Sequence, residues 1–190
     1  ISLAILSPDD RLTLLRLLAD CRATGVRIAF DNNYRPRLWE SREAAQQTYG
    51  AMLALTDLAF LTLDDDVALW GDSDEDQCLA RTRALGVDEI VIKRGAEPCL
   101  IVRQAERCEV PAVALPKARV IDTTAAGDSF SAGYLATRLA GQSVAESARY
   151  AHQLASTVIQ HRGAIIPLAA MPQSVTTDQH SNEVSHAHTA

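Results

Sequence analysis

Hydrophobic and polar positions follow two alternating patterns along most of the chain. Stretches with apolar residues at helical spacing are followed, after a turn, by short runs that are almost entirely apolar. The spacing predicts helices over 7–25, 41–55, 74–85, 127–139 and 144–160, and buried strands over 26–30, 58–61, 89–93 and 118–121. Strands and helices that alternate in this way predict an α/β domain with a largely parallel sheet.

The first predicted helix has the clearest start. Ser7 stands before Pro8, Asp9 and Asp10, which places a capping residue ahead of a proline and two acids in the first turn. Gly25 then ends the helical spacing. This segment is therefore predicted to be a helix whose ends are fixed by its own sequence.

Two segments depart from the alternation. Residues 99–103 and 108–113 have the composition of short strands with polar turns between them, which predicts a hairpin-like insertion. After Pro172 the chain is polar and almost without apolar residues, so residues 173–190 are expected to form a disordered tail.

The overall composition is that of an ordinary soluble globular protein, with 47% hydrophobic and 22% charged residues. Lys and Arg number 18 against 24 Asp and Glu, a formal charge of -6, and no long basic run is present. Duplex nucleic acid is therefore not an expected partner. No apolar run approaches the roughly 20 residues that span a membrane, so no membrane association is expected either.

The cysteines and the first residues indicate the compartment. Four widely spaced cysteines without a CxxC pair favour reduced, mostly buried thiols over a disulfide framework: Cys21, Cys78, Cys99 and Cys108. The opening ISLAILSPDD has neither the basic region nor the cleavage site of a signal peptide. It also lacks an initiating Met and starts inside an apolar segment. A cytoplasmic protein, truncated at its N-terminus, is expected.

The most informative segment is DTTAAGDSFSAGYL, residues 122–135, where a predicted strand leads through small residues into a helix. Small side chains let the backbone approach a ligand, and the free N–H groups and dipole of a helix start favour an anion. The amides of Ala125, Ala126 and Gly127 could thus cradle phosphate oxygens. Asp128 suits a base that takes a proton from an attacking hydroxyl. The residues alone leave a simple helix cap equally open for Asp128.

Two other loops follow predicted strands, at the sheet edge where open α/β folds bind ligands. The loop DNNYRPRLW, residues 31–39, contains Arg35, whose planar guanidinium can bind a phosphate or a carboxylate through two parallel hydrogen bonds. A surface loop with Trp39 packed into the core is the alternative. For KRGAEP, residues 93–98, the residues alone favour an ordinary turn with two solvated cations.

The segment 122–135 matches, at every specified position, the C-terminal signature of the ribokinase-like (PfkB) carbohydrate kinases. The resemblance covers residues 1–172. DNNYRPRLW, LTLDD, VIKRGA and STVIQHRGAIIP further resemble the branch of this family that phosphorylates 2-keto-3-deoxygluconate. The resemblance implies a three-layer α/β/α fold with a mostly parallel central sheet. Residues 1–172 would form its C-terminal part, without the N-terminal part and the lid.

The resemblance also implies a reaction and a set of site residues. The reaction is ATP-dependent phosphorylation of 2-keto-3-deoxygluconate to the 6-phosphate, with Asp128 as general base and Ala125, Ala126 and Gly127 as the anion hole. Arg35 and Asp128 would contact the sugar acid. The implied ATP-binding residues are Asn33, Tyr34, Arg35, Lys93, Arg94, Gly95, Ala96, Glu97 and Pro98.

Mg²⁺ is the implied companion of ATP. The family usually has an Asn-x-x-Glu motif near the metal, and the matching stretch here begins with Asp64 and ends with the apolar Val67. Asp64 is therefore a candidate for acting on Mg²⁺ through water, because Mg²⁺ keeps several waters when it binds phosphates. A solvated acidic helix start is an equally open interpretation.

Two other functions stay open. In the family the missing N-terminal half supplies a sugar-binding segment and the lid, so this chain could be a nucleotide-binding fragment without catalysis. A related kinase for a neutral sugar or nucleoside would keep Asp128 but would not need Arg35. The expected partners are a small sugar acid and ATP, and a homo-oligomer of the full-length enzyme is left open.

Overall fold

The computed structural model describes residues 3–173, which fall into two compact units, Ile1–Ala114 and Leu115–Ala190. Apart from residue 173, the predicted tail lies outside the described residues. Within the described range, none of the helices combines the length and the apolar character that crossing a bilayer requires.

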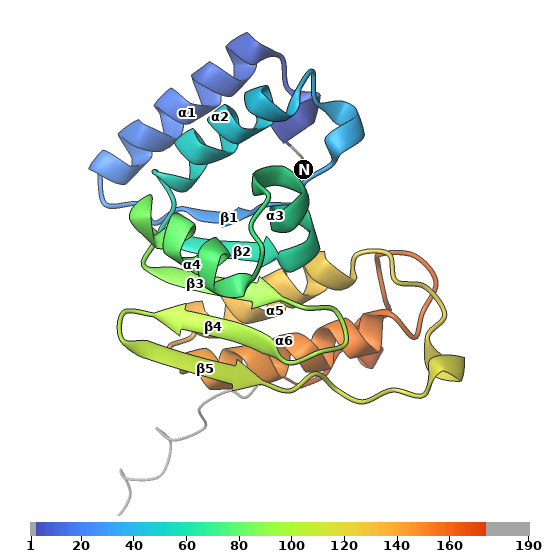
Figure 1. Ribbon diagram of the computed structural model, residues 1–190. Coiled ribbons are helices and arrows are strands. Elements are labelled where there is room, and N and C mark those ends of the chain that lie inside the picture. The colour runs from blue at the N-terminus through green and yellow to red at the C-terminus, as the bar shows by residue number, and fades with distance from the viewer. Residues whose placement is uncertain (1–2, 174–190) are drawn as a thin grey trace, which may run out of the picture. The chain divides into compact units, whose positions relative to one another are not determined.

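The first unit is built on a five-stranded sheet whose strands lie in chain order (Figure 1). The strands are β1 (Ala29–Asp31), β2 (Leu58–Thr62), β3 (Glu89–Lys93), β4 (Cys99–Arg103) and β5 (Glu106–Val110). The first three are parallel, while β4 and β5 form the predicted hairpin and run antiparallel. The carboxyl ends of β1, β2 and β3 therefore meet at one edge of the sheet, and the α/β class is confirmed.

Four helices belong to this unit: α1 (Pro8–Ala23), α2 (Arg42–Leu53), α3 (Leu63–Trp70) and α4 (Glu75–Ala84). The three helices that were predicted start at side-chain caps, because Ser7, Ser41 and Asp74 each accept an amide three residues later. Helix α3 was predicted only as an acidic helix start. Its end has a plain signal in Gly71, which takes the left-handed φ of 79° that glycine adopts without strain.

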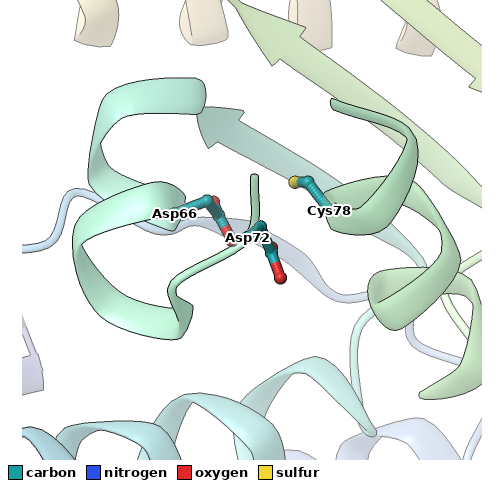
Figure 2. A group of neighbouring side chains, drawn as sticks. All are labelled: Asp66, Asp72 and Cys78. Atoms are coloured by element: carbon teal, nitrogen blue, oxygen red, sulfur yellow. The ribbon is translucent and has the colours of Figure 1, made fainter. Parts of the chain in front are cut away.

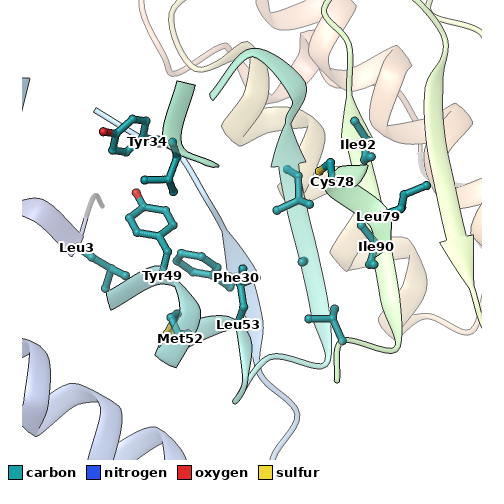
Figure 3. Close-up of a cluster of buried hydrophobic side chains, with 14 of the residues drawn as sticks. Leu3, Phe30, Tyr34, Tyr49, Met52, Leu53, Cys78, Leu79, Ile90 and Ile92 are labelled. Atoms are coloured by element: carbon teal, nitrogen blue, oxygen red, sulfur yellow. The ribbon is translucent and has the colours of Figure 1, made fainter. Parts of the chain in front are cut away.

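Tyr49 of α2 lies at the centre of the buried cluster that joins the helices to the sheet (Figure 3). Its ring centroid lies 5.6 Å from that of Phe30, 6.0 Å from that of Tyr34 and 5.6 Å from that of Trp39. Its hydroxyl donates a hydrogen bond of 2.6 Å to the carbonyl of Asn32. This cluster therefore fixes the chain directly after β1, and it buries Trp39 as the alternative interpretation of that loop expected.

The second unit contains α5 (Ala126–Leu139) and α6 (Val144–Val158), packed against each other. The closest approach is at Gly133, where a Cβ would lie 3.2 Å from the Cα of Ala151. A capping box of Ser143 and Glu146 begins α6. The glycine allows close packing, and the capping box fixes where the second helix starts.

The predicted strand over 118–121 is wrong. Lys117–Arg119 forms a 3₁₀ turn, and the amides of Ile121 and Asp122 donate to the carbonyl of Ile159 at the end of α6, at 2.8 and 3.2 Å. The apolar β-branched residues here bond to a helix end instead of to a neighbouring strand. The composition of a strand was present, but no strand within the described residues pairs with this segment.

Two strand boundaries also differ from the prediction. The first strand begins only at Ala29, because the amide of Ile28 donates to the carboxylate of Asp57 at 2.7 Å. The second strand of the hairpin ends at Val110, since the next residue, Pro111, has no N–H to donate. All four cysteines are free, and Cys78 and Cys99 are buried, as expected for reduced thiols.

Candidate functional site

Lys93 and Asp31 form an ion pair across the carboxyl edge of the sheet. Lys93 Nζ lies 2.7 Å from Asp31 Oδ2, and the two side chains are 12% and 24% exposed. The residues end β3 and β1, and β2 lies between these strands. The predicted nucleotide ligand Lys93 is thus oriented by an acid that was not predicted to belong to the site.

Arg35 lies at the same edge and leaves most of its donors open. Its Nη1 donates to the carbonyl of Tyr34 at 2.9 Å and lies 3.8 Å from Asp65 Oδ2, while its side chain is 54% exposed. Burial raises the pKa of Asp65, although Arg35, the Tyr34 backbone and Lys93 act in the opposite direction. Asn33, between Asn32 and Tyr34, has a left-handed φ of 34°. The predicted residues 33–35 therefore share one charged edge with Lys93.

The loop 94–98 is held at its two ends. Arg94 donates from Nε to the carbonyl of Pro98 at 2.6 Å, and its other nitrogens lie 3.0 Å from Glu75 and 3.1 Å from Glu109. The guanidinium is therefore engaged within the unit. The residues between the two ends, 95–97, are exposed, so their backbone is the part of this loop that a ligand can reach.

The unit also contains three metal-ligand side chains close together, Asp66, Asp72 and Cys78, whose ligand atoms all lie within 4.8 Å of one another (Figure 2). Arg81 already binds both carboxylates, since its Nη2 donates to Asp66 and, at 2.7 Å, to Asp72. Burial raises the pKa of the Cys78 thiol to about 12, which keeps it protonated. The cluster is therefore an ion-pair network and a poor cation site.

Asp64, the predicted metal residue, is exposed in the first turn of α3, beside Asp65 and the buried Asp66. An exposed carboxylate of this kind fits the contact through water that was expected. The role of Asp64 stays a prediction.

The turn before α5 has an unusual backbone. Ala125 is the N-cap of the helix and takes a left-handed φ of 58°, with no side-chain cap bond. The amide of Ala126 donates to the carbonyl of Thr123 at 3.2 Å, whereas the amides of Ala125, Gly127 and Asp128 have no backbone acceptor among residues 3–173. Two of the three predicted anion-hole amides are therefore unused within the turn.

Asp128 is exposed in the first turn of α5. In the described part of the chain its carboxylate has no hydrogen bond or ion pair, and the N-cap position of the helix is Ala125. The interpretation of Asp128 as a simple cap therefore finds no support. The side chain is available to a ligand that reaches this turn.

Asp122 holds the turn at its other end. Its two carboxylate oxygens accept the amide of Thr124 at 2.9 Å and the amide of Gly163 at 2.8 Å. The Thr124 hydroxyl, followed by the two amides, lowers the pKa of this carboxyl to about 2. An ionised Asp122 thus ties the turn to the segment after α6.

The first unit has loops at the ends of parallel strands, and the second has a helix start with free amides; both are places where α/β proteins bind anionic ligands. Residues 1–171 match the pfkB family carbohydrate kinases, and the chain belongs to that family. The chain is 61% identical over 173 residues to 2-dehydro-3-deoxygluconokinase of Escherichia coli (strain K12). The match covers 90% of this chain and 56% of that protein, so the chain spans little more than half of this relative's length.

Solved structures have the same fold. A fructokinase from Vibrio cholerae O395, in fructose, ADP and calcium ion bound form, matches with a TM-score of 0.76 and 22% identity, over 89% of this chain and 55% of that one. Aminoimidazole riboside kinase from Salmonella enterica, complexed with aminoimidazole riboside and an ATP analog, matches with a TM-score of 0.71 and 25% identity, over 84% of this chain and 53% of that one. The chain therefore has the ribokinase-like α/β fold that was predicted.

The predicted site residues fall in both units. The first brings together residues 33–35 and 93–98, and the second holds 125–128. The counter-ions Asp31 and Asp65 and the buried Asn32 were missed. The two acids could have been predicted from their positions, since Asp31 ends a predicted strand and Asp65 follows the next one.

Proposed function

We propose that this chain is the nucleotide-binding and catalytic part of an ATP-dependent kinase that converts 2-keto-3-deoxygluconate to its 6-phosphate. Membership of the pfkB family supports the class of reaction, and the 61% identity to a 2-dehydro-3-deoxygluconokinase supports the substrate. The observation that carries the catalytic assignment is the exposed, unpaired carboxylate of Asp128 beside free amides at the start of α5.

In this mechanism Asp128 accepts the proton of the sugar hydroxyl as that oxygen attacks the γ-phosphorus of ATP; the bond from the γ-phosphorus to the β,γ-bridging oxygen breaks, and ADP leaves. The amides of Ala125 and Gly127 donate to the phosphoryl oxygens, where negative charge develops, and the dipole of α5 acts in the same direction. Ala126 adds no side chain that would block the approach. Little covalent chemistry is asked of the protein, because positioning and charge stabilisation dominate phosphoryl transfer.

Mg²⁺ fits the chemistry of Asp64, whose exposed carboxylate is of the kind that binds this ion through water. When bound, the ion neutralises charge on the phosphates. Asp31 and Asp65 are engaged with Lys93 and Arg35, whereas the carboxylate of Asp64 has no hydrogen bond or ion pair among the described residues.

Two cations at the edge of the first unit, Arg35 and Lys93, are the candidates for binding anions. Arg35 is half-exposed and only loosely paired with Asp65 at 3.8 Å, so its guanidinium can bind a carboxylate or a phosphate through two bonds. Lys93 lies at the same edge, and the exposed backbone of residues 95–97 follows it. A sugar acid and a nucleotide both carry anionic groups of the kind that these two side chains can bind.

The test is an ATP-dependent phosphorylation assay on the full-length protein with 2-keto-3-deoxygluconate, fructose and ribose in parallel. We expect the sugar acid to be the preferred substrate by kcat/KM. Comparable values for a neutral sugar would favour the alternative sugar kinase. Nucleotide binding without turnover of any of the three would favour a binding protein without catalysis.

A further inference from the structure

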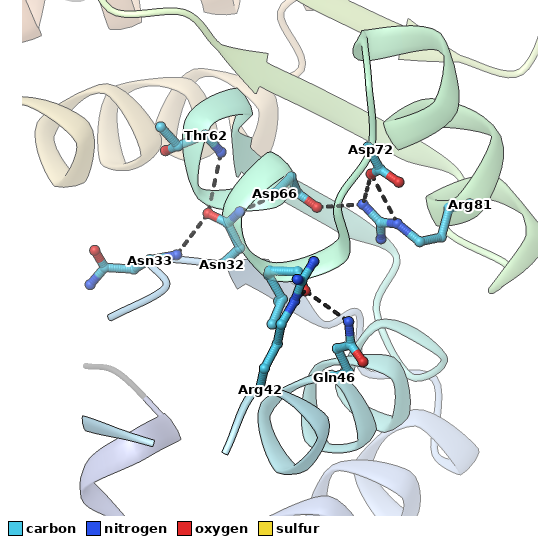
Figure 4. Close-up of polar contacts among 9 residues, drawn as sticks. Asn32, Asn33, Arg42, Gln46, Thr62, Asp66, Asp72 and Arg81 are labelled. Carbon is cyan, nitrogen blue, oxygen red and sulfur yellow. Dashed lines mark hydrogen bonds and ion pairs between the residues drawn. The ribbon is translucent and has the colours of Figure 1, made fainter. Parts of the chain in front are cut away.

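A chain of buried and partly buried polar side chains lies behind the carboxyl edge of β1 and β2 (Figure 4). Asn32, 3% exposed, donates from Nδ2 to Asp66 at 2.6 Å. Asp66, 1% exposed, accepts from Arg81, which also bonds to Asp72 and lies over the ring of Trp70 at 4.4 Å from its centroid. The orientation of the Asn32 carboxamide is therefore fixed through three successive contacts.

The oxygen of the same carboxamide accepts hydrogen bonds from two backbone amides. Asn32 Oδ1 accepts the amide of Asn33 at 2.7 Å and the amide of Thr62 at 3.2 Å, as Figure 4 shows. The backbone of Asn32 is equally engaged, since its amide donates to Phe60 at 3.0 Å and its carbonyl accepts from Tyr49. One side chain thus joins the end of β1 to the end of β2.

This arrangement requires an asparagine. The carboxylate of Asp66 can only accept and the two amides can only donate, so residue 32 must present a donor on one side and an acceptor on the other. An aspartate of the same shape would set two carboxylates against each other. A leucine would leave two amides and a buried carboxylate unsatisfied.

Both amides lead directly to the candidate site. Asn33 begins the turn 33–35 with a left-handed φ of 34°, a conformation that asparagine adopts more readily than most residues other than glycine. Thr62 is the N-cap of α3, whose first turn contains Asp64 and Asp65. The carboxamide of Asn32 therefore sets the position of Arg35 on one side and of two acids on the other.

We propose that Asn32, oriented by Asp66 and Arg81, is a positioning residue that holds the turn 33–35 and the start of α3 in the geometry that binds ligands. The proposal rests on the proposed function and adds a buried residue to the site. Asn32 acts through the backbone amides of Asn33 and Thr62.

The test uses a swap of the two partners in the full-length protein. Asn32→Asp places two acceptors opposite each other, and Asp66→Asn removes the acceptor for Nδ2. The double variant Asn32→Asp/Asp66→Asn restores one donor and one acceptor, with the carboxylate moved to position 32. Thr56→Val is the matched control, because it removes a buried hydrogen bond, 2.8 Å from Thr56 Oγ1 to Met52, before the amino end of β2.

The first measurement is hydrogen exchange at the amides of Asn33 and Thr62, which does not depend on activity. In Asn32→Asp we expect both amides to exchange about ten-fold faster or more, since their acceptor is displaced. The double variant should return to within about three-fold of the parent, and Thr56→Val should leave both amides unchanged. Unchanged exchange in Asn32→Asp would overturn the proposal.

The second measurement is steady-state kinetics with ATP and the sugar acid. Asn32→Asp should raise at least one KM about ten-fold while kcat falls less than about three-fold, because the lost geometry concerns binding residues and not Asp128. The double variant should recover most of this loss. A faster-exchanging Asn32→Asp with both KM values unchanged, or a double variant without recovery, would refute a positioning role. If the parent phosphorylates no sugar, the proposed function fails, and exchange alone decides whether Asn32 fixes the turn.

Discussion

The candidate residues of the two units differ in how they are already engaged. In the first unit the cations have partners: Lys93 lies 2.7 Å from Asp31, Arg94 lies 3.0 Å from Glu75, and Arg35 lies 3.8 Å from Asp65. In the second unit Asp128 is exposed, and no partner for it exists among the described residues.

This difference separates two tasks. A paired cation is held in one orientation before a ligand arrives, so less side-chain freedom is lost on binding. Such residues suit recognition. An acid without a partner keeps its lone pairs for the reacting hydroxyl, which suits proton transfer. In the proposed function, binding thus belongs to the sheet edge and proton transfer to the helix start.

Removing the unpaired acid should give the largest effect. Asp128→Asn keeps the shape of the side chain but removes the base, so turnover should fall by about 10² to 10⁴ while nucleotide affinity stays near that of the parent. Steady-state kinetics and calorimetric titration of the nucleotide measure the two quantities. Asp20→Asn, the same substitution at an exposed position of α1, is the control.

Asp65→Asn, measured in the same assay, tests whether a residue of the first unit affects binding more than turnover. Asp65 lies against Arg35, so its loss should act mainly on KM and leave most of kcat. Turnover of Asp128→Asn within a few-fold of the parent, or a larger kcat loss in Asp65→Asn, would reverse the assignment of tasks.

Two helical glycines, one in each unit, differ in how closely their helices are packed. Gly133 of α5 has no room for a Cβ, which would lie 3.2 Å from both Ala151 Cα and Leu154 Cδ2, whereas a Cβ at Gly50 of α2 would meet only Trp70 at 3.9 Å. Gly50→Ala should stabilise by about 0.5 to 1 kcal/mol through helix propensity. Gly133→Ala should lose this gain and cost about 1 to 3 kcal/mol through overpacking. Denaturant unfolding with tryptophan and circular dichroism signals measures both, and an equal gain at the two sites would contradict the close packing of α5 on α6.

Local signals in the sequence were sufficient for most of the fold. Caps at Ser7 and Asp74, and the apolar run 89–93, depend on neighbours a few residues away, so their elements appear where they were predicted. Residues 118–121 failed because a strand needs a partner strand, and that partner is not encoded within the segment. Here the backbone bonds instead to the end of α6.

The same limit applies to the site. The predicted residues were found through loops after strands and through the motif 122–135, both of which are local. Their counter-ions are distant in sequence, since Asp31 and Lys93 are joined only by strand order, and Asn32 meets Asp66 only in the fold. Such pairings depend on strand register and helix placement, which composition does not specify.

A double-mutant cycle at Asp31 and Lys93 tests whether this ion pair stabilises the carboxyl edge of the sheet. The side chains are largely buried, so Asp31→Asn and Lys93→Met should show a coupling free energy of about 1 kcal/mol in unfolding. The exposed pair Arg107 and Asp76 serves as the control, and its coupling should be close to zero because water screens it. Equal coupling in the two pairs would mean that Lys93 is not held in advance.

The smallest expected effect is on the pH dependence of stability, through Asp122. The carboxyl pKa values of the two units are shifted in opposite directions. Burial raises the pKa of Asp65 and Asp66 in the first unit, whereas hydrogen bonds lower the pKa of Asp122 from 3.8 to about 2. An acid whose pKa is lowered on folding stabilises the folded state above its unfolded-state pKa, and this contribution disappears as the pH falls. The second unit should therefore lose stability between about pH 4 and about pH 2.

Acid unfolding of the parent, Asp122→Asn and Thr124→Val, followed by exchange of the Gly163 amide, measures this dependence. Asp122→Asn should flatten the slope in that pH window, and Thr124→Val should do so in part, since the Thr124 hydroxyl is the main cause of the lowered pKa. Because Asp122 is largely solvated, the change should be modest. An unaltered slope in Asp122→Asn would mean that the turn before Asp128 is ordered by α5 and α6 alone, without the ionised carboxylate that bonds to Thr124 and Gly163.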